Sequence, residues 1–284
     1  MSQNHLSLDF PIKTPASARA LNEELPPLMP NFAKVLDHLG TVHFSRFMVK
    51  GDEKLLFLSD VDGEIDKYIE RLVESAGPLL DAIFKHVENP PATPAASNPE
   101  RVIKWLSGHI REPIDTYFAY GDASVQDIKA AARAAGFTGN TPQNTLLTYM
   151  SFKSRVQGFV SKLVGPALLG KKGHKASDSI GTLHLAHWVP FENNHLGFFT
   201  VYDGSVEKCF QDFAEKTSFT FDTLFPNIVG APPTPVAKNA QAFLQWGLES
   251  NYPAMGFYSA YPGLAVQDIR ALLADRKSRS DIAA

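Results

Sequence analysis

An internal repeat constrains this chain more than any other feature of its sequence. Leu39–Gly–Thr–Val–His43 recurs as Ile180–Gly–Thr–Leu–His184, at a shift of 141 positions. The same shift relates several further pairs: Asp62–Gly63 with Asp203–Gly204, Asp81 with Asp222, Trp105 with Trp246, and Val125–Gln–Asp–Ile128 with Val266–Gln–Asp–Ile269. Stacked repeat proteins have periods of about 20–50 residues. A period this long therefore indicates a duplicated, domain-sized unit.

Composition excludes several classes of protein. The 284 residues are 44% hydrophobic and carry a net charge of −3, which is typical of a globular protein. A single cysteine, Cys209, excludes an internal disulfide framework and a multi-cysteine zinc site. The first residues lack the pattern of a signal peptide, and no uncharged apolar run reaches the roughly 18 residues that span a bilayer. We expect a cytoplasmic protein.

Each copy has the pattern of an α+β unit. Thr41 to Val49 and Leu55 to Ser59 are rich in β-forming residues, and apolar residues at helical spacing follow Asp62–Gly63. A proline-rich break then precedes a helix around Trp105, a strand over 115–120 and a final helix. We expect a sheet with helices on one face. The predicted segments are an N-terminal extension (1–38), a first ferredoxin-like repeat (39–135), a basic helical connector (136–179), a second repeat (180–275) and a C-terminal tail (276–284).

One short motif adds a family resemblance. Asp60–Val–Asp62–Gly63 and Val201–Tyr–Asp203–Gly204 are similar to the end of the GxxDG motif of dye-decolourising peroxidases, although Ser59 and Thr200 replace its first glycine. The duplicated unit resembles the dimeric α+β barrel superfamily, which includes those peroxidases and chlorite-dismutase-like haem proteins. This resemblance implies two ferredoxin-like units in a barrel-like arrangement within one chain. It also implies a pocket that could hold haem.

Two histidines are the strongest candidates for chemistry. Alternation along the first strand of each copy places His43 and Phe47, or His184 and Trp188, on a face opposite the one expected to meet the helices. Such a face resembles the wall of a pocket, where the histidines could act as an acid–base pair, metal ligands or haem contacts. The alternative is structural: each histidine forms a hydrogen bond to the other copy. Retention in both copies favours that alternative.

Three pairs of aspartates have competing interpretations. Asp62 and Asp203 precede helices and are expected to cap them, or else to serve as the distal acid of a peroxidase-like pocket. Asp127 and Asp268 fall in a first helical turn and have the pattern of capping residues. Asp81 and Asp222 fall inside helices, where a buried acid needs a partner. Arg46 and His187 are the expected partners and also candidate ligand-binding residues.

The middle of the chain is basic. From 128 to 177 there is no acidic residue, whereas eight lysines and arginines occur there, including Lys171, Lys172 and Lys175. Apolar residues from Leu146 to Val164 recur at helical spacing between them. This pattern indicates a basic amphipathic helix that could contact a membrane surface or an anion, or else an ordinary linking helix with solvated lysines. No nucleic-acid module is apparent.

These observations leave three functions open. The first is a haem- or small-molecule-binding protein with peroxidase-like activity, in which His184 would ligate iron and Asp203 or Asp62 would move the proton of peroxide. The second is a non-catalytic lipid- or partner-binding protein that uses the basic connector. The third is a cofactor-free enzyme of the same superfamily that acts on an aromatic or fatty substrate. The sequence contains no GxGxxG, P-loop, HExxH or nucleophile elbow, so nucleotide-binding and hydrolase functions are not favoured.

Overall fold

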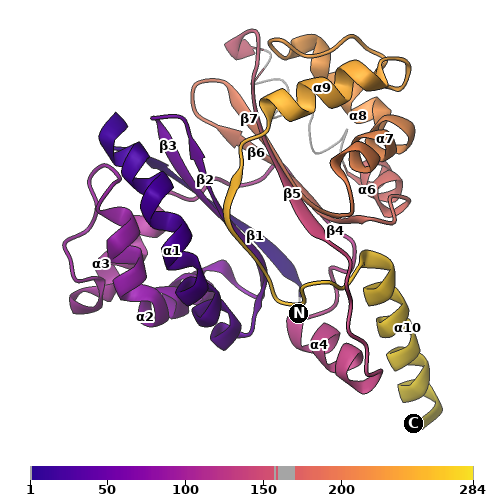
Figure 1. Cartoon of the computed structure of the whole chain (residues 1–284), viewed down its shortest axis with the longest axis horizontal. Coiled ribbons are helices and arrows are strands. Elements are labelled where there is room, and N and C mark those ends of the chain that lie inside the picture. Colours follow the sequence, from indigo (N-terminus) through magenta and orange to yellow (C-terminus); the bar gives the residue numbers. More distant parts are fainter. Residues whose placement is uncertain (1, 157, 159–169, 284) are drawn as a thin grey trace. The chain divides into compact units, whose positions relative to one another are not determined.

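The chain folds into two compact units, seen in a computed structural model that describes residues 2–156, 158 and 170–283 (Figure 1). Unit 1 comprises Met1–Glu112, Asp122–Lys129 and Pro253–Tyr261. Unit 2 comprises Pro113–Gly121, Ala130–Tyr252 and Pro262–Ala284. Each unit contains one four-stranded antiparallel sheet.

Unit 1 is a sheet with helices on one face. Its strands are β1 (Gln3–Pro11), β2 (Val42–Lys50), β3 (Lys54–Asp62) and β8 (Ala254–Ser259), in the order β1-β3-β2-β8. Its helices are α1 (Pro15–Leu39), α2 (Ile65–Phe84), the short 3₁₀ turn η1 (Ala95–Ser97) and α3 (Pro99–Ser107). Phe32 of α1 contacts Phe47 and Phe57 of the sheet, with ring centroids 5.4 and 5.8 Å apart. These contacts identify the face of the sheet that the helices cover.

Unit 2 repeats this arrangement with different strands. Its strands are β4 (Asp115–Phe118), β5 (Gln143–Ser151), β6 (Leu183–Phe191) and β7 (His195–Asp203), in the order β4-β6-β7-β5. Its helical elements are α6 (Lys171–Asp178), α7 (Val206–Lys216), α8 (Ser218–Leu224), η2 (Phe225–Asn227), η3 (Val236–Lys238), α9 (Ala240–Ser250) and α10 (Val266–Ala283). Aromatic residues dominate the core between sheet and helices: Trp188, Phe198, Phe210, Phe213, Phe221, Phe225 and Phe243. Helix α4 (Val125–Ala134) begins in unit 1 and ends in unit 2.

The two sequence copies exchange one strand. β4 belongs to the first copy but pairs with β6 of the second, while β8 belongs to the second copy and pairs with β2 of the first. Each sheet therefore contains two strands of one copy and one of the other, and β1 or β5, which precede the copies in sequence, supplies the fourth. The expectation of an α+β chain with duplicated ferredoxin-like units is confirmed, and the barrel-like arrangement of the units stays a prediction.

The structure differs from the sequence analysis at both ends of each copy. The expected extension 1–38 contains β1 and α1, and β1 pairs with β3 along its whole length. In the expected connector 136–179, Leu146, Leu147 and Met150 lie in β5, where a helix was predicted. The short apolar run fits either period, and only pairing with β7 decides between them. Most of the remaining predicted helix, 159–169, lies outside the described residues, and residues 276–283 of the predicted tail continue α10.

Beyond the first residues of β2 and β6, the side chains point to the faces of the sheet opposite to those predicted. A register shift interrupts the pairing between Val42 and Phe44, and again between Leu183 and Leu185. A bulge of this kind inserts one residue and inverts the alternation beyond it. Phe47 and Trp188, expected to line a pocket wall, consequently face the helices.

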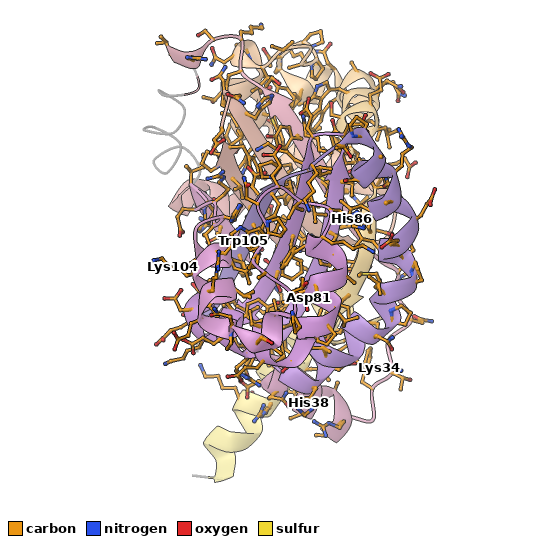
Figure 2. All side chains as sticks on the ribbon, turned by 90° about the vertical axis from the view of Figure 1, so that its left-hand side faces the viewer. Lys34, His38, Asp81, His86, Lys104 and Trp105 are labelled. Carbon is orange, nitrogen blue, oxygen red and sulfur yellow. The ribbon has the colours of Figure 1, made fainter. Side chains whose placement is uncertain are left out.

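The aspartates inside helices have backbone partners. Asp81 of α2 accepts from the N–H of Ala95 at 3.0 and 3.1 Å, and Asp222 of α8 accepts from the N–H of Val236 at 2.7 Å. Figure 2 shows Asp81 and Trp105 on the helical side of unit 1. The expected pairs of these aspartates with Arg46 and His187 are therefore wrong.

None of the described helices combines the length and apolar character needed to cross a bilayer.

Replacing Phe10 by alanine tests whether the first strand belongs to the core. Phe10 is fully buried and stacks on Trp105 with ring centroids 5.0 Å apart. We expect Phe10→Ala to lower the free energy of unfolding by about 3–5 kcal/mol, measured by urea denaturation. Arg19→Ala, at an exposed position of α1, should change it by less than about 0.5 kcal/mol. Equal effects of the two substitutions would show that 1–38 is a dispensable extension.

Candidate functional site

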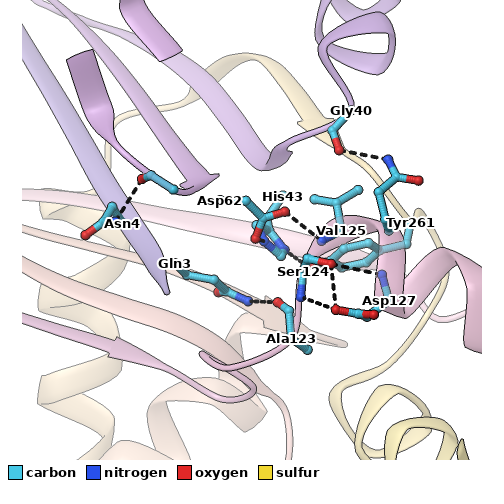
Figure 3. A network of polar contacts seen from close by, with 12 residues as sticks. Gln3, Asn4, Gly40, His43, Asp62, Ala123, Ser124, Val125, Asp127 and Tyr261 are labelled. Carbon is cyan, nitrogen blue, oxygen red and sulfur yellow. Dashed lines mark hydrogen bonds and ion pairs between the residues drawn. The ribbon is translucent and has the colours of Figure 1, made fainter. Parts of the chain in front are cut away.

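His43 lies at the centre of a buried hydrogen-bonded triad in unit 1 (Figure 3). Its Nδ1 is 2.8 Å from the Tyr261 hydroxyl, and its Nε2 is 2.9 Å from Oδ1 of Asp62. Oδ2 of Asp62 accepts from the N–H of Val125 at 2.8 Å, at the start of α4. Both ring nitrogens of His43 are therefore engaged, Nε2 by the carboxylate and Nδ1 by the phenol.

The same triad occurs in unit 2. His184 Nδ1 is 2.7 Å from the Tyr120 hydroxyl, and its Nε2 is 2.8 Å from Oδ1 of Asp203. Oδ2 of Asp203 accepts from the N–H of Val266 at 2.8 Å, at the start of α10. In both triads the tyrosine and the histidine belong to different sequence copies. Each hydrogen bond therefore joins the two copies, as the structural interpretation of the histidines predicts.

The aspartates of the triads cap helices, but not the helices that follow them in sequence. Asp62 and Asp203 satisfy the first N–H groups of α4 and α10, whereas Ser205 caps α7. The capping interpretation of Asp127 and Asp268 is confirmed, since they accept from the N–H groups of Ser124 and Ala265. A carboxylate at a helix start stabilises free donors and the positive end of the dipole.

The triads do not fit the haem that the resemblance implies. An axial histidine needs a nitrogen lone pair available to iron. In His184 both ring nitrogens are engaged, Nε2 by the carboxylate of Asp203 and Nδ1 by the hydroxyl of Tyr120, and the side chain is fully buried. His43 is engaged in the same way by Asp62 and Tyr261. Neither histidine offers a ligand atom, so these residues do not fit an axial ligand of haem.

The four predicted ligand-binding residues do not lie together in one site. Phe47 stacks on Phe57 in the core of unit 1, and Trp188 stacks on Phe198 in unit 2, with centroids 4.6 and 4.2 Å apart. His187, on the face of β6 away from the helices, lies against Phe118 at 5.0 Å. Trp188 lines a pocket of unit 2, and Arg46 belongs to a polar cluster in unit 1.

Arg46 belongs to a buried polar cluster on the face of the unit 1 sheet that the helices leave uncovered. Its Nη1 donates to Oδ2 of Asp60 at 2.7 Å, and Oδ1 of Asp60 is 2.6 Å from Nδ1 of His5. Nε2 of His5 is 2.8 Å from the Ser7 hydroxyl. The side chains of Arg46, Asp60 and His5 are 0% exposed.

Unit 2 contains a narrow aromatic pocket between its sheet and helices. The cavity volume is about 30 Å³, which is room for about one water molecule. Aromatic, small and hydroxyl side chains line it, among them Trp188, Phe198, Phe213, Phe221, Ala186, Ser177, Thr217 and Thr220. This cavity does not hold a macrocycle, and a small ring needs the lining side chains to move apart before it can enter.

An Asp–His pair completes the lining of this pocket. Nε2 of His174, on α6, lies 3.0 and 3.1 Å from the two carboxylate oxygens of Asp115, on β4. Burial raises the pKa of Asp115, and the charge and hydrogen bond of His174 partly oppose that rise. Burial also raises the pKa of Tyr117, which holds its phenol neutral beside Asp178 and Arg270. In the tautomer in which Nε2 donates to the carboxylate, Nδ1 is the ring nitrogen that can accept a proton.

Sequence analysis missed several of these residues, and one signal could have revealed some of them. Gln3–Asn4 recurs as Gln143–Asn144 at a shift of 140, one less than the rest of the repeat. Asn4 and Asn144 donate to the carbonyls of Gly63 and Gly204, so the short match marks equivalent strands. This extension would have located His5 and Ser7 in the sheet. No comparable signal precedes Asp115 or His174, which only folding brings together.

Comparisons with known proteins add no family. No protein-family model matches the chain, and no curated protein does. Two similar solved structures are putative monooxygenases: one from Lactobacillus acidophilus NCFM (6% identity, 92% of this chain and 98% of that chain, TM-score 0.40) and one from Fusobacterium nucleatum subsp. nucleatum ATCC 25586 (7%, 93% and 97%, 0.42). A third is a haem-binding protein from Thermus thermophilus (12%, 96% and 96%, 0.28). TM-scores this low carry no argument about activity.

Alanine substitution of either triad histidine should destabilise the fold by a similar amount. Each substitution removes the hydrogen bonds that the histidine forms with a buried tyrosine hydroxyl and with one carboxylate oxygen, at a cost on the order of 1–3 kcal/mol per group. We expect His43→Ala and His184→Ala to lower the urea midpoint alike. Haem titration of the native protein should give no Soret band that depends on His184. A band lost only in His184→Ala would contradict the structural role.

The pKa of Asp115 predicts a specific pH dependence of stability. Because its folded pKa lies above the unfolded value, the folded chain binds more protons between the two, and stability rises as pH falls through that window. Asp115→Asn removes this contribution. Urea unfolding at a series of acidic pH values should show a free energy of unfolding that increases with acidity in wild type relative to the variant. A constant difference across that series would contradict the raised pKa.

Proposed function

We propose that the protein binds a small aromatic molecule in the pocket of unit 2 and moves a proton on it without a cofactor. The observation that carries this proposal is the combination of aromatic walls with a paired, half-buried histidine in one pocket. His174 is the described histidine that both lines this pocket and has a carboxylate partner. Functional pockets commonly join an apolar lining to a few polar groups.

The chemistry follows from the orientation of the imidazole. Asp115 accepts from Nε2–H, which sets the tautomer and stabilises the imidazolium that forms when Nδ1 takes a proton. A phenol or an enol bound against Trp188 and Phe198 could lose its acidic proton to His174. The aromatic walls supply dispersion contacts and exclude water from the ring. The substrate class is therefore a small ring that carries an ionisable hydroxyl group.

The other two functions have less support. Peroxidase chemistry through haem depended on His184, whose nitrogens are both engaged. Lipid or partner binding depended on a continuous basic helix, but 143–151 form a strand of the sheet. Contact of Lys171, Lys172 and Lys175 with a membrane surface remains a proposal that rests on their charge alone.

Closing the pocket tests the proposal. Ser177 lies on α6 at a partly exposed position of the lining, so Ser177→Phe should fill the space at little cost in stability. We expect small phenols, for example nitrophenols, to quench the fluorescence of Trp188 in wild type and to lose at least about tenfold in affinity in the variant.

Two further variants complete this experiment. Ser179→Phe, exposed at the end of α6 and outside the lining, should bind the phenols as wild type does. His174→Gln should retain binding but no longer favour the phenolate, which the absorbance of bound nitrophenol reports. Unchanged affinity in Ser177→Phe, or no affinity for any phenol in wild type, would overturn the proposal.

A further inference from the structure

The pocket of unit 2 lies at a position that unit 1 fills with a phenylalanine of its own. Phe32 of α1 packs there against Phe47 and Phe57 of the sheet, with ring centroids 5.4 and 5.8 Å away. The shift of 141 that relates the two copies gives the equivalents of these three residues in unit 2: Gly173, Trp188 and Phe198. All three line the pocket. The ring that closes this space in unit 1 is therefore missing from unit 2.

The ends of the two helices show that this equivalence holds in space. In unit 1, Oδ1 of Asp37 accepts from the Tyr258 hydroxyl at 2.9 Å and from Nζ of Lys129 at 3.3 Å. The residues 141 positions later repeat both contacts, at 3.0 and 3.1 Å: Asp178, Tyr117 and Arg270. Helix α6 therefore takes, within unit 2, the position that the last turns of α1 take within unit 1.

Helix α6 also lacks a second apolar side chain of its counterpart. The buried Leu36 of α1 corresponds to Ser177. Over 173–178, where the structure describes the side chains of α6, none belongs to the aromatic core of unit 2. A polar pair, His174 with Asp115, links this helix to the sheet. Movement of α6 away from the sheet would therefore admit a ring without separating packed apolar side chains.

The size of the space follows from what replaces the missing side chains. Three facing side chains are larger in unit 2 than their equivalents in unit 1: Trp188 for Phe47, Phe213 for Leu72 and Phe221 for Leu80. They refill part of the room that Phe32 and Leu36 occupy in unit 1, which leaves a cavity of about 30 Å³. An outward movement of α6 then restores room for one six-membered ring, and not for two fused rings.

The polar pair of the pocket belongs to the unit that lacks the phenylalanine. At the positions of His174 and Asp115, the shift of 141 places Ala33 and Gly256 in unit 1. Met29 packs so closely on Gly256 that a Cβ added there would lie 1.9 Å from its sulfur. Unit 1 thus fills this corner with an apolar side chain, whereas unit 2 places a hydrogen-bonded histidine there. An aromatic space beside such a group has the character of a ligand site.

We infer that the ligand of this pocket is a monocyclic aromatic molecule whose ring takes the place that Phe32 takes in unit 1. Gly173 is the residue that determines this specificity, because it leaves the place of the ring empty. The ring packs between α6 and the sheet, against Trp188 and Phe198. This inference rests on the proposed binding of an aromatic molecule in unit 2, and it adds the position of the ring and the number of rings.

Fluorobenzene tests the position of the ring separately from proton transfer, because it has no ionisable group. Fluorine NMR of the wild-type protein should show that it binds, and a fluoronaphthalene should bind at least about tenfold more weakly. Gly173→Phe supplies the missing ring from α6, as Phe32 does from α1. We expect this variant to lose at least about tenfold in affinity for fluorobenzene. Its urea midpoint should stay at or above that of wild type, because the new ring is buried and a helical glycine is replaced.

Two further variants complete the test. Gly173→Leu places an aliphatic side chain in the same space and should weaken binding in the same direction, so the result does not depend on the folding of one variant. Ser179→Phe adds a ring at an exposed position outside the lining and should bind fluorobenzene as wild type does.

The outcomes separate this inference from the proposed proton transfer. No binding of fluorobenzene to wild type, equal affinity for fluoronaphthalene, or unchanged affinity in the folded Gly173 variants would each overturn the inference. Binding of fluorobenzene that depends on Gly173, together with nitrophenol absorbance that does not depend on His174, would support the inference and overturn the proton transfer.

Discussion

The fold depends on a hydrogen bond between a histidine of one sequence copy and a tyrosine of the other. His43 and Tyr261 form it in unit 1, and His184 and Tyr120 form it in unit 2. In both units the tyrosine follows the exchanged strand, and the histidine lies in the bulge of the strand that receives it. Inside a protein such a bond is strong, and leaving either group unpaired is costly. The triad therefore fixes which strand completes each sheet.

The bulge that holds each histidine also sets the two faces of the sheet. Beyond it, Phe47 and Trp188 turn toward the helices, and Arg46 and His187 turn away. In unit 1 this places Arg46 beside Asp60 and His5, and in unit 2 it places Trp188 on Phe198 in the aromatic pocket. One inserted residue per copy thus determines where polar chemistry and aromatic packing occur.

The two units share a common set of elements, here called the frame: the paired strands, the capped helices and the histidine triads. The frame retains its capped helices, paired strands and triads in both copies, because each is needed to satisfy buried polar groups. The differences lie where the frame does not need a particular residue. Unit 1 has the Ser7–His5–Asp60 cluster, and unit 2 has the pocket with Asp115 and His174. The proposed function belongs to the second of these differences.

The sequence by itself determined the duplication and the α+β class, because a constant shift preserves spacing, and it favoured a structural role for the two histidines without excluding a catalytic one. Its prediction that Arg46 and Trp188 bind a ligand stays a prediction. The tertiary structure decided the strand exchange, the reversed faces and the partners of each side chain. Strand pairing joins residues far apart in the chain: His5 meets Asp60, and Asp115 meets His174. Local periodicity cannot report such contacts, because it describes the face of an element and not what lies against it.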